Sequence, residues 1–263
     1  MKKWIALGFA VIAAVLLLLL PNTPKKQYYH HQGHVFGTYY NIRYEGTEDL
    51  HTAIQQRLLE FDNSLSMFNK NSVISKINRN EEVQTDSLFE HMYYEAQAIS
   101  QLSDGAFDIT VAPLVNAWGF GFKHALDMDS AKIDSLLQFV GYNKIKLEGG
   151  RVIKEDERTM LDCSSIAKGY GVDVVGKLLK SKGIQNYMVD IGGEVVLSGK
   201  NPKMKKWRIG INKPTDDSLS INQELQTILE ISDAGMATSG NYRKFYYKDG
   251  KKYAHTIDPR MGS

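Results

Sequence analysis

Cysteine is almost absent from this 263-residue sequence, which contains only Cys163. A single cysteine excludes a disulfide within the chain and with it the small disulfide-stapled folds. We interpret Cys163 as a buried core residue, because a free thiol packs like a small hydrophobic group. An excess of one charge is also lacking, since 32 Lys and Arg stand against 30 Asp and Glu. The net charge of +2 therefore gives no argument for a nucleic-acid partner, which would need a clustered basic face.

Long apolar runs are limited to one, from Trp4 to Leu20, which follows Lys2 and Lys3. Its 17 residues would reach roughly 25 Å as a helix, near the lower limit for crossing a bilayer. No small residues mark a cleavage point, so an anchor is favoured over a signal segment. Since short basic N-termini usually stay in the cytoplasm, we place the remaining chain on the periplasmic, outer face of a bacterial inner membrane. We predict a membrane anchor or signal segment and a linker at residues 1–27. One domain is predicted at residues 28–263.

The remaining sequence has the composition of a globular protein, with 43% hydrophobic and 24% charged residues. After a polar linker reaching about Gly33, alternation predicts a strand over Phe36 to Tyr44. Helical spacing predicts helices at 50–65, 88–102, 130–140 and 166–182. Further strands are predicted at 144–147, 151–154, 187–191, 194–197, 207–211, 227–231, 244–247 and 252–257. Because strands and helices do not alternate steadily, the pattern indicates an α+β fold.

One polar cluster follows the second of these helices, where Gly105 ends the helix and the chain is expected to enter a strand carrying Asp108. Its carboxylate could accept hydrogen bonds from a ligand amide or base edge. An aspartate that stabilises a turn explains the residue equally well.

A second cluster, residues 161–173, runs from a strand into a helix with serines in its first turn and then Lys168. Unpaired N–H groups at a helix start suit a diphosphate, and Lys168 adds a full positive charge. Asp162 and Ser164 are also ordinary capping residues. Capping does not explain Gly169 and Gly171 inside the helix, where each costs roughly 1 kcal/mol against Ala. Close approach of a ligand or of backbone is the simpler cause.

The same segment allows a different class of enzyme, because Ser165 and Lys168 match the S-x-x-K of penicillin-binding serine acyltransferases. That class also needs S-D-N and K-T-G motifs downstream. The sequence has Thr238, Ser239 and Gly240 without the lysine, so this alternative is the weaker one.

Two further clusters are ambiguous by themselves. Gly192 and Gly193 separate Asp190 and Ile191 from Glu194, and a hairpin turn accounts for them. His255 is expected on a strand with Tyr253 and Ile257 on the same face, where a satisfied core histidine is a serious alternative to a functional one.

Taken together and in this order, these segments resemble the ApbE family of FAD:protein FMN transferases. The matching segments are 36–38 (FGT), 68–69 (FN), 105–110 (GAFDIT), 116–121 (NAWGFG), 167–170 (AKGY), 190–193 (DIGG), 238–240 (TSG) and 255–259 (HTIDP). Each motif is weak, but their collinear combination over nearly all of the chain after the anchor is specific.

The resemblance implies an α+β fold of two related subdomains with FAD between them. It assigns FAD contacts to Phe36, Phe68, Ala106, Phe107, Asp108, Asp162, Lys168 and Ile257. It makes the backbone carbonyl of Ser165 a Mg²⁺ ligand and gives His255 and Lys168 catalytic roles. The implied reaction is attack by a Thr or Ser hydroxyl of an acceptor protein, such as a subunit of a membrane redox complex, on FAD with release of AMP.

The sequence departs from the family in one respect that concerns the metal. The resemblance places further ligands, an Asp and a Thr on a later helix, beyond the 255–259 segment, and the 263 residues contain no such helix. We therefore expect a C-terminally truncated domain. A membrane-anchored protein that binds FAD without processing it is the remaining alternative.

Overall fold

The computed structural model describes residues 24–121, 125–215, 224–242 and 244–263. Within these ranges no helix combines the length and apolar character needed to cross a bilayer. The predicted anchor, Trp4 to Leu20, lies outside the described residues.

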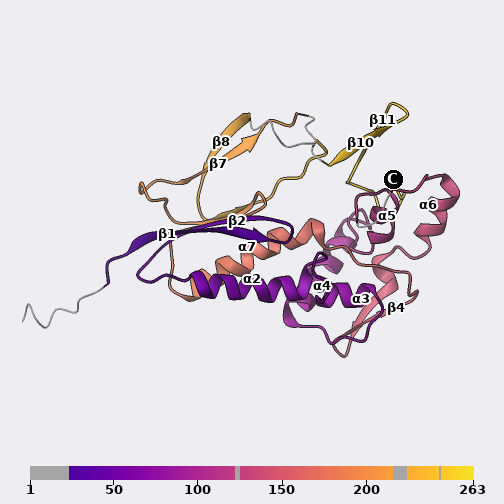
Figure 1. The fold of residues 1–263 in the computed structure, drawn as a ribbon, viewed down its shortest axis with the longest axis horizontal. Helices are drawn as coiled ribbons and strands as arrows, with labels where there is room; N and C mark the ends of the chain where they lie inside the picture. The colour runs from indigo at the N-terminus through magenta and orange to yellow at the C-terminus, as the bar shows by residue number, and fades with distance from the viewer. Residues whose placement is uncertain (1–23, 122–124, 216–223, 243) are drawn as a thin grey trace, which may run out of the picture.

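The centre of the fold is a five-stranded antiparallel sheet with the order β1-β2-β5-β6-β9 (Figure 1). Its strands are β1 (Gln27–Val35), β2 (Thr38–Gly46), β5 (Tyr187–Ile191), β6 (Glu194–Ser198) and β9 (Ala234–Met236). β2 pairs with β5 in a register that sets Tyr40 opposite Ile191 and Tyr44 opposite Tyr187. The sheet thus joins the beginning of the domain to its middle.

Helices α2 (His51–Leu65) and α7 (Ser164–Ser181) pack against one face of this sheet. The apolar residues of β2 and β5 alternate with partly exposed ones, and the inward set packs against both helices in one core cluster. Ile42, Ile54 and Val175 in this cluster are fully buried. Successive side chains of a strand point to opposite faces of the sheet, so the alternating apolar pattern places one set of side chains in the core.

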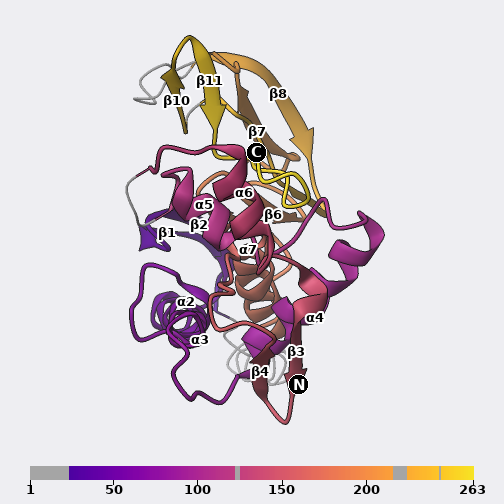
Figure 2. The same ribbon diagram turned by 90° about the vertical axis from the view of Figure 1, so that its right-hand side faces the viewer.

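The opposite face of the sheet is covered by a hairpin of β7 (Trp207–Asn212) and β8 (Leu225–Ile231). Trp207 is buried against Val195 and Leu197 of β6. Figures 1 and 2 agree that this hairpin and α2 lie on opposite sides of the sheet. The domain therefore has a layered arrangement with the sheet in the middle.

A second core lies beyond the helices, where α4 (Ser87–Leu102), α3 (Val73–Asn78) and the hairpin β3 (Ile145–Glu148) and β4 (Arg151–Lys154) pack on α2 and α7. Phe61, Phe89 and Leu161 are among its fully buried side chains. The remaining elements are α5 (Ala112–Ala117), α6 (Ser130–Leu137), the 3-10 turn η1 (Tyr142–Lys144), β10 (Phe245–Lys248) and β11 (Lys251–Ala254). Figure 1 places α5, α6, β10 and β11 together at the end of the molecule that holds the C-terminus.

Most predicted elements are present, and the α+β class is confirmed, but several predictions are wrong. The strand predicted from Phe36 begins at Thr38, because Phe36 and Gly37 form the turn before it. The strand predicted ahead of α7 is reduced to an isolated bridge at Met160. The segment before Gly33 is not a linker, because residues from Gln27 onward form β1. Asp108 lies in the loop after α4 rather than in a strand. β11 ends at Ala254, so His255 follows the strand instead of belonging to it.

Candidate functional site

The start of α7 is joined to the loop that contains Asp108. The Asp162 N–H donates to the carbonyl of Ile109 at 2.6 Å, and Asp162 Oδ1 accepts the N–H of Ser164 at 2.8 Å. Ser165 follows as the second residue of the helix and is exposed. The positive end of the helix dipole thus faces solvent beside the serines, in an arrangement that suits an anion.

Lys168 lies one turn further along α7 and reaches the turn between β5 and β6. Its Nζ is 2.8 Å from Glu194 Oε2. A Cβ on Gly192 would lie 3.2 Å from Lys168 Cδ, and Gly192 has a φ of 57°, which glycine adopts without strain. The lysine stem therefore passes directly over the backbone of this turn.

Asp190 adds a second carboxylate at the same turn. Its Oδ1 accepts the N–H of Gly193 at 3.0 Å. Burial raises the pKa of Asp190, the negative charge of Glu194 raises it further, and Lys168 opposes both. The turn thus combines one ammonium group with two acidic groups.

His255 lies in the C-terminal segment, where the charge of Lys168 acts on its imidazole. Its Nδ1 lies 3.3 Å from the Lys244 carbonyl, and its ring meets Phe120 edge-on at 6.5 Å. Desolvation lowers the pKa of His255, and the charges of Lys244 and Lys168 lower it further, against the opposing effect of the Lys244 carbonyl. The imidazole is therefore neutral at pH 7 and able to accept a proton.

Two aromatic rings flank the turn between β1 and β2. Phe36 and Gly37 have φ of 53° and 70°, the left-handed conformation of a two-residue hairpin turn. A bulky residue in this conformation costs about 1–3 kcal/mol, and such strain is concentrated at functional sites. The Phe36 ring packs 4.9 Å from Phe61, whereas Phe68 is 62% exposed. A Cβ on Gly37 would lie 3.2 Å from the Phe68 ring.

The loop after α4 holds Ala106 exposed, Phe107 half-buried against the second core, and Asp108 buried. Asp108 Oδ1 accepts from both the N–H and the hydroxyl of Thr110 at 2.7 Å, and Oδ2 accepts the N–H of Tyr142 at 2.6 Å. Burial raises the pKa of Asp108, and these hydrogen bonds oppose the rise. Its carboxylate thus holds the loop together, which is the turn-stabilising role considered from the sequence.

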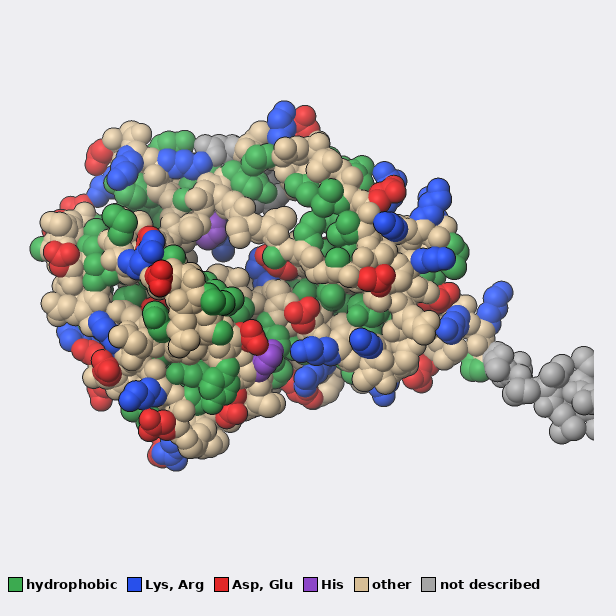
Figure 3. All heavy atoms as spheres, turned by 180° about the vertical axis from the view of Figure 1, so that it is seen from behind, with side chains coloured by type: hydrophobic (Ala, Val, Ile, Leu, Met, Phe, Trp, Pro, Cys, Tyr) green, Lys and Arg blue, Asp and Glu red, His purple; other side chains and the backbone are tan. Residues whose placement is uncertain are grey.

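The C-terminal segment closes on the same loop. Ile257 is half-buried, and the Arg260 side chain comes within 3.8 Å of the position that a Cβ on Gly105 would take. Trp118 Nε1 donates to the carbonyl of Gly262 at 2.7 Å. The segments at 105–108, 116–121 and 255–262 are therefore brought together from distant parts of the sequence. Figure 3 shows the surface hollowed on the far side of the molecule, with a histidine at the wall of the hollow.

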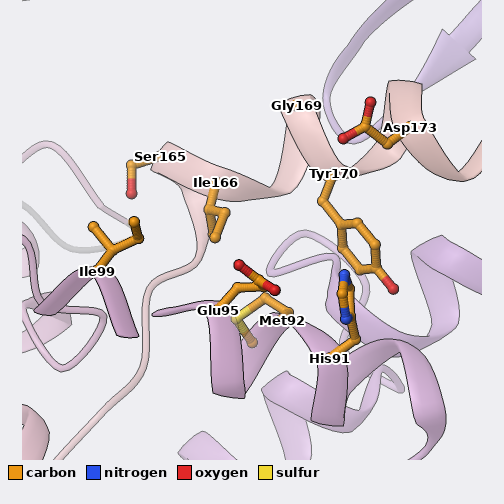
Figure 4. Close-up of a pocket in the computed structure, with 9 residues that line it drawn as sticks. All are labelled: His91, Met92, Glu95, Ile99, Ser165, Ile166, Gly169, Tyr170 and Asp173. Atoms are coloured by element: carbon orange, nitrogen blue, oxygen red, sulfur yellow. The ribbon is translucent and has the colours of Figure 1, made fainter. Parts of the chain in front are cut away.

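A cavity of about 470 Å³ lies on another face of α7, between this helix and α4 (Figure 4). No pattern in the sequence predicted this cavity. Ser165 stands at one end of the cavity, with Ile166 and Tyr170 pointing toward α4. The polar groups that line it further along are His91, Glu95 and Asp173. His91 and Glu95 lie one helical turn apart, a spacing that could have indicated a shared face.

The metal prediction receives no support from this arrangement. Among the residues that the structure describes, no three His, Cys, Asp or Glu side chains are placed to hold a metal ion. Around the start of α7, Asp162 Oδ1 is bonded to Ser164. The described side chains alone therefore do not form a Mg²⁺ site at Ser165.

Comparison with known proteins identifies the family. The ApbE family model matches residues 36–263. The chain is 38% identical over 243 residues to an FAD:protein FMN transferase of Vibrio cholerae, covering 88% of this chain and 71% of that protein. It is 31% identical over 247 residues to the Escherichia coli K12 protein of the same name, covering 88% and 69%.

Solved structures agree. The flavin transferase ApbE from Vibrio cholerae superposes with a TM-score of 0.78 at 37% identity, covering 90% of this chain and 78% of that one. The apo form of the Pseudomonas stutzeri flavinyl transferase ApbE gives a TM-score of 0.77 at 30% identity, covering 90% and 76%. On the strength of a family match that extends over the whole described site, this chain belongs to the ApbE family.

Proposed function

We propose that this chain is an FAD:protein FMN transferase that moves FMN from FAD onto a Thr or Ser hydroxyl of an acceptor protein. The observation that carries the proposal is Lys168, a cation held at the β5–β6 turn beside the start of α7, whose charge also acts on the imidazole of His255 in the C-terminal segment. A cation of this kind suits a diphosphate substrate, and a neutral imidazole suits a hydroxyl nucleophile as its base.

The chemistry divides among these residues as follows. The acceptor hydroxyl oxygen attacks the FMN-side phosphorus, the P–O bond to the AMP half breaks, and AMP leaves. His255 takes the hydroxyl proton, which its lowered pKa allows at neutral pH. Lys168 and the N–H groups at the start of α7 offset the charge of the diphosphate, since phosphoryl transfer depends mainly on positioning and charge neutralisation.

The remaining substrate contacts follow from the same geometry. Phe68, with its exposed ring, and Phe36 are proposed to stack on the flavin or the adenine. Further FAD contacts are proposed, through the resemblance, for Ala106, Phe107, Asp162 and Ile257 in the neighbouring segments. Asp108 contributes by holding its loop through its hydrogen-bonded carboxylate.

Mg²⁺ dependence is part of the proposal through the resemblance, with the Ser165 carbonyl as a ligand. Because the described side chains form no metal cluster, we assign no step of the reaction to the ion. Addition of EDTA tests the dependence directly. Retention of transfer by Ser165→Ala is expected, because a backbone oxygen survives removal of the hydroxyl. Labelling of Ser165 by a penicillin reporter would instead support the acyltransferase alternative.

The decisive test incubates the full chain with FAD, Mg²⁺ and an acceptor domain that carries a candidate Thr. Flavin fluorescence of the acceptor band in a gel reports transfer, and chromatography reports AMP. We expect both signals from the wild type at its natural length, neither from His255→Asn, and no labelled band when the acceptor Thr is replaced by Ala. Tight FAD binding without AMP release or labelling would favour a protein that binds FAD without processing it.

The location is proposed from the sequence alone. We place the chain at a bacterial inner membrane, held by Trp4 to Leu20, with the domain on the periplasmic face near acceptors in membrane redox complexes. Fractionation of cells that express the full chain or a chain starting at Pro24 tests this placement. Equal release of both forms into the soluble fraction would contradict the anchor.

A further inference from the structure

Lys168 needs a fixed position, and its own side chain does not supply one. A lysine stem has four rotatable carbons and a point charge, so an unrestrained ammonium group occupies many places. On α7 the stem is restrained at two points, by the backbone of Gly192 beneath Cδ and by Glu194 at Nζ. The second of these restraints is the one that sets where the charge lies.

We infer that Glu194 is a positioning residue for FMN transfer, which holds the Lys168 ammonium group against the FAD diphosphate. This inference rests on the proposed function and extends it to a residue that touches neither the flavin nor the acceptor. Glu194 begins β6, immediately after the two glycines of the β5–β6 turn. Its backbone is paired with Ile191 of β5, so the base of its side chain is fixed by the sheet.

Glu194 and Lys168 differ in how far their side chains are buried. The Glu194 side chain is 12% exposed and the Lys168 side chain 34% exposed. The carboxylate therefore sits behind the ammonium group, on the protein side, and the lysine is the partner that faces solvent. A diphosphate approaching from solvent would meet the positive charge first.

The contact between them is an ion pair without a directed hydrogen bond. Glu194 Oε2 is buried and has no hydrogen-bond partner among the described residues, although Lys168 Nζ is 2.8 Å away. The three ammonium hydrogens are therefore not all committed to the carboxylate. They can be donated to phosphate oxygens while the carboxylate still restrains the nitrogen.

The same arrangement predicts that substitution of Glu194 affects FAD affinity and the rate of transfer differently. A carboxylate near the diphosphate weakens FAD binding slightly by repulsion, whereas a well-placed ammonium accelerates the transfer step. Replacing Glu194 with Gln removes the charge at nearly constant size. FAD affinity should then be unchanged or tighter, while kcat falls, because displacement by about 1 Å can cost on the order of 100-fold in rate.

The test is a double-mutant cycle in the full chain with Glu194→Gln, Lys168→Met and both together. Transfer kcat, KM for FAD and FAD affinity by fluorescence quenching are measured for each. We expect a 10- to 100-fold loss of kcat in Glu194→Gln, in line with roughly 100-fold for a misplaced group. We also expect the double variant to be no slower than Lys168→Met alone. Partial recovery in Glu194→Asp, which retains the charge on a shorter side chain, would support the positioning role.

A matched control breaks another Glu pair outside the site. Glu230 pairs with Arg208 in the β7–β8 hairpin at 3.6 Å, with both side chains exposed. Glu230→Gln should leave kcat and FAD affinity at wild-type values, and thermal unfolding of all variants should separate loss of fold from loss of rate.

The outcomes distinguish this inference from the proposed function. Additive effects of the two substitutions, or wild-type kcat in Glu194→Gln, would overturn the role of Glu194 while leaving the transferase intact. If the wild type binds FAD without releasing AMP, the proposed function fails. In that case FAD affinity is the quantity compared across the double-mutant cycle. Additive changes in affinity would again overturn the coupling of Glu194 to Lys168, and coupled changes would support it.

Discussion

Two glycines of α7 differ in what surrounds them, and alanine at each should change the stability of the fold in opposite directions. A Cβ on Gly169 would meet no described atom within 4 Å. A Cβ on Gly171 would lie 3.2 Å from Phe36 Cε2 and 3.4 Å from Ile191 Cδ1. Close packing of the protein itself therefore accounts for Gly171 but not for Gly169, which lines the cavity beside α4.

The magnitudes follow from helix propensity and packing. Ala is favoured over Gly inside a helix by about 1 kcal/mol, so Gly169→Ala should raise the melting temperature by roughly 2–4 °C in a chain of this size. At Gly171 the same gain is opposed by overpacking of about 1–3 kcal/mol. Because the Phe36 backbone is held in the hairpin turn, its ring has little room to move. We expect Gly171→Ala to lower the free energy of unfolding by up to about 2 kcal/mol.

The assay is urea and thermal unfolding of the full chain, followed by far-ultraviolet circular dichroism, for both variants and the wild type. The glycines lie two residues apart in one helix, so each variant is the control for the other. Equal stabilisation by both alanines would refute the close contact between Gly171 and Phe36. Destabilisation by Gly169→Ala would refute the open space beside Gly169.

Three other predictions concern the loop, the lysine and the C-terminal segment. Asp108→Asn unpairs the N–H of Tyr142 and should lower the free energy of unfolding in urea by about 1–3 kcal/mol, whereas wild-type stability would show that the carboxylate does not hold the loop. Burial lowers the pKa of Lys154 to about 8 from 10.5. The unfolded state then binds more protons between these values, so the free energy of unfolding should rise with pH over this window, and Lys154→Met should flatten the rise. Trp118→Phe removes the hydrogen bond to the Gly262 carbonyl and should lower the free energy of local opening at residues 258–262 by about 1 kcal/mol, which faster amide hydrogen exchange would report. Unchanged exchange would show that this hydrogen bond does not restrain the chain end.

The long helices could be predicted because the pattern of their apolar side chains follows from which face of each helix is buried. In α4 and α7 the apolar residues recur at helical spacing, since one face of each helix is buried in a core. β1 lacks such a signal. It is an edge strand with His30, His31 and His34 among half-exposed neighbours, and its pairing with β2 alone makes it a strand. A polar edge strand resembles a linker until its partner is known.

The candidate site could be predicted only in part, for a similar reason. Motifs indicate which segments are unusual, and Lys168 stands out beside two helical glycines. The pairing of Lys168 with Glu194 depends on how α7 lies across the β5–β6 turn, which no local pattern records. Asp108 illustrates the reverse case, because a turn-stabilising and a ligand-binding aspartate share the same sequence context until Thr110 and Tyr142 are placed around it.

The pairing of β2 with β5 has a consequence for how the chain acquires its structure during synthesis. Tyr44 and Tyr187 are directly paired, yet most of the helices are made between them. At roughly 5–20 residues per second, β2 waits on the order of ten seconds for its neighbour. During that time its inner edge offers unpaired N–H and C=O groups beside Ile42 and Tyr44, an arrangement prone to pairing with other chains. Slow, non-local closure of this kind makes the nascent β1–β2 hairpin the part of the molecule that most needs protection from aggregation until β5 emerges.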